Sequence, residues 1–159
     1  MRWLLVLAAF WTQAAAAETI SGTVVTVIDG DTLTVADSAK KHYRVRLAGI
    51  DAPEAKQPYG LQSARSLAGL CYRKTAKVDW KDKERGLLLG QVSCDGAAAN
   101  EEQVRRGMAW VSPRQAVMPG SALYELETYA RLRKIGLWAD DKAMPPWEWR
   151  STGHGKGAK

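Results

Sequence analysis

The chain has 159 residues, a formal net charge of +6 and two cysteines. This length suits one domain of ordinary size, and neither cysteine lies in a metal-ligand pattern, which argues against a zinc site. A basic chain is consistent with a polyanionic partner such as nucleic acid or anionic lipid, but also with good solubility alone.

The first 17 residues have the pattern of a secretory signal peptide. Arg2 supplies a positive charge, residues 3–11 form an apolar run too short to span a bilayer, and alanines at 15–17 offer a cleavage site before Glu18. The alternative is an uncleaved membrane anchor. We expect a periplasmic or secreted protein with no stable membrane association once the signal is cleaved.

The next part of the chain predicts three β-strands in a meander. Residues 19–28 are rich in Val, Ile and Thr, residues 33–36 resume an extended run, and residues 43–50 alternate apolar and charged side chains. The sequences DGDT and DSAKK between these runs are turn signals.

The later elements predict an α+β fold. We expect a helix at 58–70, strands at 75–80 and 87–94 joined by the charged KDKERG, a helix capped by Asn100 that stops at Gly107, and a longer helix from Ser121 to Ile135, which ends at Gly136. This order suggests a five-stranded OB-fold barrel with about three helices, formed by residues 18–150. Residues 151–159 are expected to be a disordered tail.

Cys71 and Cys94 remain after the predicted processing. In an oxidising compartment, an even number of cysteines makes a disulfide between them the expected arrangement. The alternative is that the two thiols are buried and pack as small hydrophobic groups.

The stretch RVRLAGIDAPE at residues 44–54 gathers charges of both signs at the end of a strand. A period of two places Arg44 and Arg46 on one face of this strand. Pro53 then fixes the direction of the chain, so Asp51 and Glu54 lie around a rigid corner and their carboxylates can converge.

These residue types suit phosphodiester cleavage. In a barrel, the turn that carries Asp31 could lie beside the corner, so Asp31 and Asp51 would offer hard oxygen ligands to a Ca²⁺-like ion, with the Ala52 carbonyl as a further ligand. Arg46 could clamp a phosphate. Glu54 could orient or deprotonate an attacking water.

The motifs VIDGDT, RLAGIDAPE and PYG, followed by ANEEQVRRGMAWV, GLWAD and PPWEWR, strongly resemble the staphylococcal nuclease family. The resemblance runs from about residue 24 to residue 149. It implies an OB-fold and a Ca²⁺-dependent nuclease that cleaves DNA and RNA to 3′-phosphate products.

The resemblance also implies roles for individual residues. Asp31 and Asp51 match the metal aspartates, Glu54 matches the general base, and Arg46 matches the first phosphate-binding arginine. Asp29 matches an acidic position near the metal.

One family motif does not match. Members carry a second catalytic arginine in a D-x-Y-G-R motif, and this chain has DKERGLLLG, which places Leu87 at the arginine position. Arg85 is the candidate replacement, because in a regular strand residues 85 and 87 face the same side. If Arg85 does not serve, the alternative function is a catalytically weakened, nucleic-acid-binding OB module.

The family's base-stacking tyrosines are also missing, and Ser112-Pro113-Arg114 stands at one of their positions. Base stacking contributes roughly 1–3 kcal/mol per base. We therefore expect nucleotide binding that is weaker and more sensitive to salt. The expected partners are DNA and RNA, with single strands favoured, and the expected state is a monomer.

Overall fold

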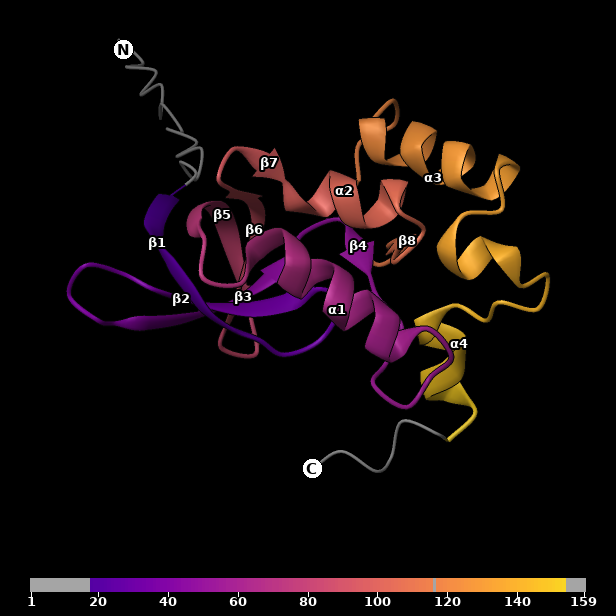
Figure 1. The fold of residues 1–159 in the computed structure, drawn as a ribbon, viewed down its shortest axis with the longest axis horizontal. Coiled ribbons are helices and arrows are strands. Elements are labelled where there is room, and N and C mark those ends of the chain that lie inside the picture. The colour runs from indigo at the N-terminus through magenta and orange to yellow at the C-terminus, as the bar shows by residue number, and fades with distance from the viewer. Residues whose placement is uncertain (1–17, 116, 154–159) are drawn as a thin grey trace, which may run out of the picture.

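A β-barrel forms the centre of the structure, a computed structural model that describes residues 18–115 and 117–153 (Figure 1). Its strands are β1 (Glu18–Val27), β2 (Thr32–Ala36), β3 (His42–Leu47), β5 (Thr75–Glu84) and β6 (Leu87–Cys94). They follow the order β3-β2-β1-β5-β6, and a parallel pairing of β3 with β6 closes the barrel. The predicted α+β fold with a five-stranded OB-type barrel is confirmed. The predicted signal peptide lies outside the described residues.

Alternation along the strands builds the interior of the barrel. In β3, Val45 and Leu47 are fully buried, whereas Arg44 is exposed and Arg46 is partly exposed. Leu33 and Val35 of β2 are also fully buried. The period of two therefore separates a hydrophobic core from a charged outer face, as predicted.

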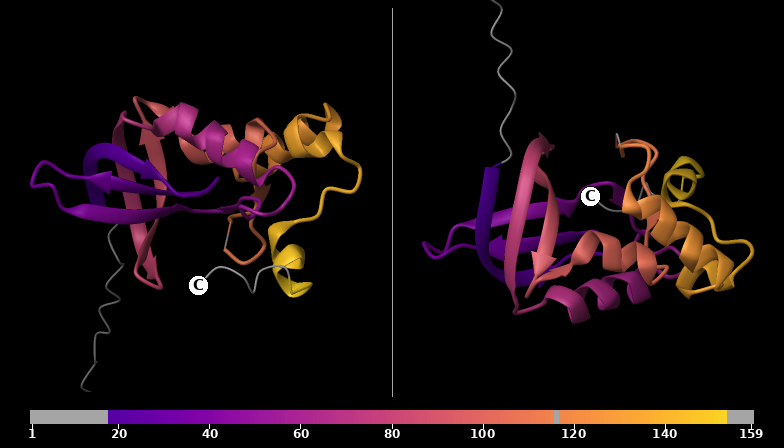
Figure 2. Two further views of the ribbon diagram at one scale, coloured as in Figure 1. Left: turned by 60° about the horizontal axis from the view of Figure 1, so that its bottom comes forward. Right: turned by 90° about the horizontal axis from the view of Figure 1, so that it is seen from above.

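The described residues form four α-helices beside the barrel: α1 (Gly60–Cys71), α2 (Ala99–Arg105), α3 (Ala122–Leu132) and α4 (Pro146–Ser151), with a 3₁₀ turn η1 (Gly136–Ala139). Helix α1 contacts β1, α2 contacts β6, and α3 packs on α2. Figure 2 shows α3, η1 and α4 extending from one end of the barrel. Within the described ranges, no helix is long and apolar enough to cross a membrane.

Three short strands complete the sheets. Strand β4 (Ile50–Asp51) pairs with β8 (Trp110–Val111), and β7 (Ala97–Ala98) adds to β6. The β4–β8 pair matters for the site, because it holds Asp51 against the segment that follows α2.

The segment KDKERG joins the two strands as expected, but only its last two residues, Arg85 and Gly86, form the turn. Strand β5 continues through Lys83 and Glu84, which pair with Leu88 and Leu87 of β6, after a bulge between Trp80 and Asp82. Charged side chains are tolerated there because all four residues from Lys81 to Glu84 are exposed. The result is a long hairpin that projects beyond the core.

The two predicted helix caps have different outcomes. Ser121 caps α3, because its hydroxyl accepts a hydrogen bond from the Leu123 amide, but α3 ends at Leu132, before Gly136. The prediction for Asn100 is wrong: α2 starts at Ala99, and the Asn100 side chain is buried. Asn100 accepts from the Val92 amide and donates to the carbonyls of Ala48 and Gly90, so it ties α2 to the barrel.

A disulfide joins Cys71, the last residue of α1, to Cys94, the last residue of β6. Both cysteines are buried, and the bond closes a loop over a sequence separation of 23. It fixes the end of α1 to the barrel wall.

Replacing both cysteines by alanine is expected to lower the free energy of unfolding by about 3 kcal/mol, because the unfolded chain regains the freedom that the closed loop removes. Urea denaturation of the oxidised protein and the variant measures this difference. Adding a reductant should lower the free energy of unfolding of the wild-type protein and leave that of the variant unchanged. A variant as stable as the oxidised protein would contradict the prediction.

Candidate active site

The DGDT turn and the corner after β4 meet at one end of the barrel. The Ala52 amide donates to Oδ2 of Asp31 over 2.8 Å, and the Thr32 hydroxyl donates to Oδ1 over 2.8 Å. The Asp31 amide donates to Oδ1 of Asp29 over 3.0 Å. The turn thus lies beside the corner, as the sequence suggested, and the Asp31 carboxylate joins these two segments.

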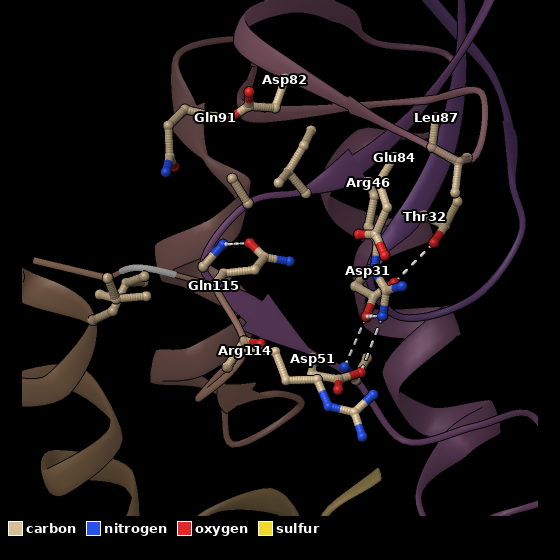
Figure 3. Close-up of a pocket in the computed structure, with 18 of the residues that line it drawn as sticks. Asp31, Thr32, Arg46, Asp51, Asp82, Glu84, Leu87, Gln91, Arg114 and Gln115 are labelled. Atoms are coloured by element: carbon tan, nitrogen blue, oxygen red, sulfur yellow. Dashed lines mark hydrogen bonds and ion pairs between the residues drawn. The ribbon is translucent and has the colours of Figure 1, made fainter. Parts of the chain in front are cut away.

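Arg46 reaches both aspartates from β3 (Figure 3). It pairs with Thr32 across the strands, and its Nη2 lies 3.1 Å from Oδ1 of Asp51 and 3.5 Å from Oδ2 of Asp31. Burial disfavours the arginine charge, but the carboxylates of Asp31 and Asp51 outweigh it and raise the pKa of Arg46. The guanidinium group therefore stays in its charged form.

The pKa of the Asp31 carboxyl group is strongly raised. Burial, together with the nearby charge of Asp29, raises the pKa of Asp31 to about 7, despite Arg46 and the hydrogen bonds from Ala52 and Thr32. A bound cation favours ionised carboxylates, so it would oppose this rise.

A fully buried glutamine, Gln103, holds the DGDT turn in place by a hydrogen bond. Nε2 of Gln103, on α2, donates to the Gly30 carbonyl over 2.7 Å and to the Ser63 carbonyl over 3.2 Å. Gly30 itself must lack a side chain, because an added Cβ would lie 1.8 Å from Oγ of Ser63. The position of Asp31 therefore depends on close packing between its turn, α1 and α2.

Replacing Gln103 by Leu is expected to destabilise the protein by about 1–3 kcal/mol, because buried carbonyl groups lose their donor. The same change at Gln62, exposed on α1, is the matched control and should have little effect. Thermal or urea unfolding measures both. Equal stability of the two variants would show that Gln103 does not support the turn.

Arg150 is a site residue that the sequence did not predict. Its Nη2 lies 2.6 Å from Oδ2 of Asp51, and its Nη1 lies 2.6 Å from Oε1 of Glu54 and 3.2 Å from Oδ1 of Asp51. These hydrogen bonds, first to Asp51 and then to Glu54, raise the pKa of Arg150 against its partial burial. Its partners precede it by 99 and 96 residues, so no local spacing in PPWEWR signals the contact.

The site opens into a cleft with a volume of about 1610 Å³. The carboxylates of Asp29, Asp31, Asp51 and Glu54 line it together with Arg46 and Arg150, and the β5–β6 hairpin forms part of its wall. In Figure 3 the side chain of Arg114 also extends toward Asp51. The cleft thus combines acidic and basic groups around one open space.

Arg85 does not lie on a strand face with Leu87, so that expectation is wrong. Glu84 pairs directly with Leu87, and Arg85 and Gly86 form the two-residue turn of the hairpin, with φ of 49° and 82°. Positive φ at both positions is typical of a type I′ turn. Arg85 lines the cleft from this exposed turn, and within the described ranges it pairs with no carboxylate.

The donor set fits a hard divalent cation by its chemistry. Four carboxylates against two guanidinium groups leave two net negative charges when all are ionised, and carboxylate and carbonyl oxygens are the ligands that Ca²⁺ prefers. Among the described residues, no group of three or more His, Cys, Asp or Glu side chains is arranged to hold a metal ion. The carboxylates of Asp51 and Glu54 instead contact arginines.

The barrel and this site define an OB-fold protein with an acidic, arginine-lined cleft. A family model described as staphylococcal nuclease homologue matches residues 44–140, and the chain belongs to that family. A protein from Escherichia coli named "Uncharacterized endonuclease" is 45% identical over 133 residues, which cover 82% of this chain and 85% of the relative. "Micrococcal nuclease" from Shigella flexneri is 35% identical over 139 residues, 81% of this chain and 79% of the relative.

Proposed function

We propose that the protein is a Ca²⁺-dependent nuclease that hydrolyses phosphodiester bonds in both DNA and RNA and attacks within the strand. The observation that carries the proposal is the convergence of Asp31, Asp51, Arg46 and Glu54 at the floor of one open cleft. The names of the E. coli and Shigella relatives support the same reaction class.

Each residue has a task that follows from its chemistry. Asp31 and Asp51, with the Ala52 carbonyl, would hold the ion, which supplies positive charge next to the phosphate. Arg46 donates to phosphate oxygens and stabilises the charge that builds up on them. Glu54 is more exposed than the two aspartates and takes the proton of the attacking water. Arg85 contacts the nucleic-acid backbone from the rim of the cleft.

The test is a cleavage assay of the purified protein on single-stranded DNA and on RNA, with Ca²⁺ and with a chelator. Cutting of both substrates that requires Ca²⁺ supports the proposal. Binding of nucleic acid without cutting would overturn it in favour of the nucleic-acid-binding module.

We also propose that the protein works outside the cytoplasm. The Cys71–Cys94 disulfide supports this location, because such bonds persist in oxidising compartments. Fractionation of the producing cells tests it, and a protein confined to the cytoplasm would contradict it.

A further inference from the structure

The geometry points to Arg150 as the second phosphate-binding arginine of the site, supplied by α4 in place of the missing hairpin arginine. This inference rests on the proposed nuclease function. Arg150 lies outside residues 44–140, the part of the chain that the family model matches.

Arg150 lies next to Arg46 at the carboxylate of Asp51. Arg46 Nη2 and Arg150 Nη1 contact the same atom, Oδ1 of Asp51, over 3.1 and 3.2 Å. The two nitrogens cannot be farther apart than the sum of these distances. A phosphate that accepts hydrogen bonds of about 2.8 Å can therefore bridge both guanidinium groups through different oxygens.

Arg46 and Arg150 bring two positive charges to the carboxylate of Asp51, at 3.1 Å and 2.6 Å. Both side chains are about one quarter exposed and border the cleft. If Asp51 bound a cation, it would offer Arg150 less negative charge, and Arg150 would then share its charge between Glu54 and a phosphate in the cleft.

Gln57 connects the segment before α4 to the loop that carries Glu54. Gln57 donates through Nε2 to the Met144 carbonyl over 2.5 Å and accepts through Oε1 from the Glu54 amide over 3.1 Å. Trp149 and Gln57 line the same small cavity, beside Trp110. The segment that carries Arg150 is thus connected through Gln57 to the loop that carries Glu54, which brings the two side chains to the same part of the cleft.

Within the described residues, the hairpin arginine makes no ion pair with Asp51 or Glu54, whereas Arg150 pairs with both. Leu87 occupies the expected position, and Arg85 extends from an exposed two-residue turn instead of a strand. An arginine whose side chain already touches Asp51 and Glu54 needs a smaller displacement to reach a phosphate between them.

The experiment compares Arg150→Gln, Arg150→Lys, Arg85→Gln and, as a control for the lost charge, Arg65→Gln on the exposed face of α1. Calorimetry measures the affinity for thymidine 5′-monophosphate in Ca²⁺, and a cleavage assay measures the rate on single-stranded DNA. Arg150→Gln is expected to weaken nucleotide binding by about 10-fold or more and to slow cleavage by about 10² to 10³. Arg150→Lys should recover only part of both, and Arg65→Gln should match the wild-type protein.

Nucleotide affinity and cleavage in Arg150→Gln equal to or above the wild-type values would overturn the inference, since Arg150 would then only block the carboxylates. The inference would also be overturned if Arg85→Gln, and not Arg150→Gln, showed the large loss of nucleotide affinity and cleavage rate. If Arg150→Gln does not fold, the test uses Arg150→Lys, because lysine keeps the positive charge that pairs with Asp51 and Glu54. Wild-type nucleotide affinity and cleavage rate in Arg150→Lys would then count against the inference. A wild-type protein that binds the nucleotide but does not cleave single-stranded DNA would refute the proposed nuclease function. The nucleotide affinities of the variants would still show whether Arg150 binds phosphate.

Discussion

Replacing Glu54 by Gln is expected to slow phosphodiester cleavage by about 10² to 10⁴ while nucleic-acid binding is retained. The amide keeps the size of the side chain and can still accept a hydrogen bond from Arg150, but it cannot take a proton from water at neutral pH. Glu54 is 41% exposed, so the fold should tolerate the change. Single-turnover cleavage of single-stranded DNA in Ca²⁺ gives the rate.

Glu84→Gln is the matched control, because Glu84 lies in the same cleft on the exposed hairpin. It should cleave at close to the wild-type rate. Equal losses in both variants would mean that the cleft needs its overall negative charge and that Glu54 has no special role.

Replacing Arg46 by Lys is expected to lower the cleavage rate by about 10² to 10³. Lysine preserves the charge but cannot present two N–H groups in a fixed plane, which a phosphate and the carboxylate of Asp51 require together. The rate on single-stranded DNA in saturating Ca²⁺ measures the effect.

Arg44→Lys provides the control for this second prediction. Arg44 is two residues earlier on β3, also borders the cleft, and is exposed. A similar loss at Arg44 would indicate that general attraction for nucleic acid, and not the contact at Asp51, limits the reaction.

Local sequence patterns were sufficient to predict most of the barrel and the acidic part of the site. The period of two in β3 placed Arg46 outward, and the rigid corner at Pro53 held Asp51 close to Glu54. Asp31 could be placed beside this corner because its turn and the corner flank neighbouring strands. These relations depend on residues close in the chain or on adjacent strands, which simple stereochemistry fixes.

The remaining site residues depend on contacts that local patterns do not encode. Asn100 was expected to cap a helix, but the backbone groups of Ala48 and Val92 compete for its side chain and are brought near it only by the folded barrel. Arg85 was placed on a strand because the two-residue turn depends on how β5 and β6 pair. Arg150 meets Asp51 only after α4 has packed beside the corner.

The residues of the site lie on elements that differ in local stability. Arg46 and Asp51 stand on strands of the barrel and its small sheet, whereas α4 has six residues and buries only Pro146. Short elements with few buried contacts open at much lower free energy than the global fold. The amides of α4 should therefore exchange with solvent sooner than those of β3, and a nucleotide that engages Arg150 should slow that exchange, so hydrogen exchange at this helix reports occupancy of the cleft.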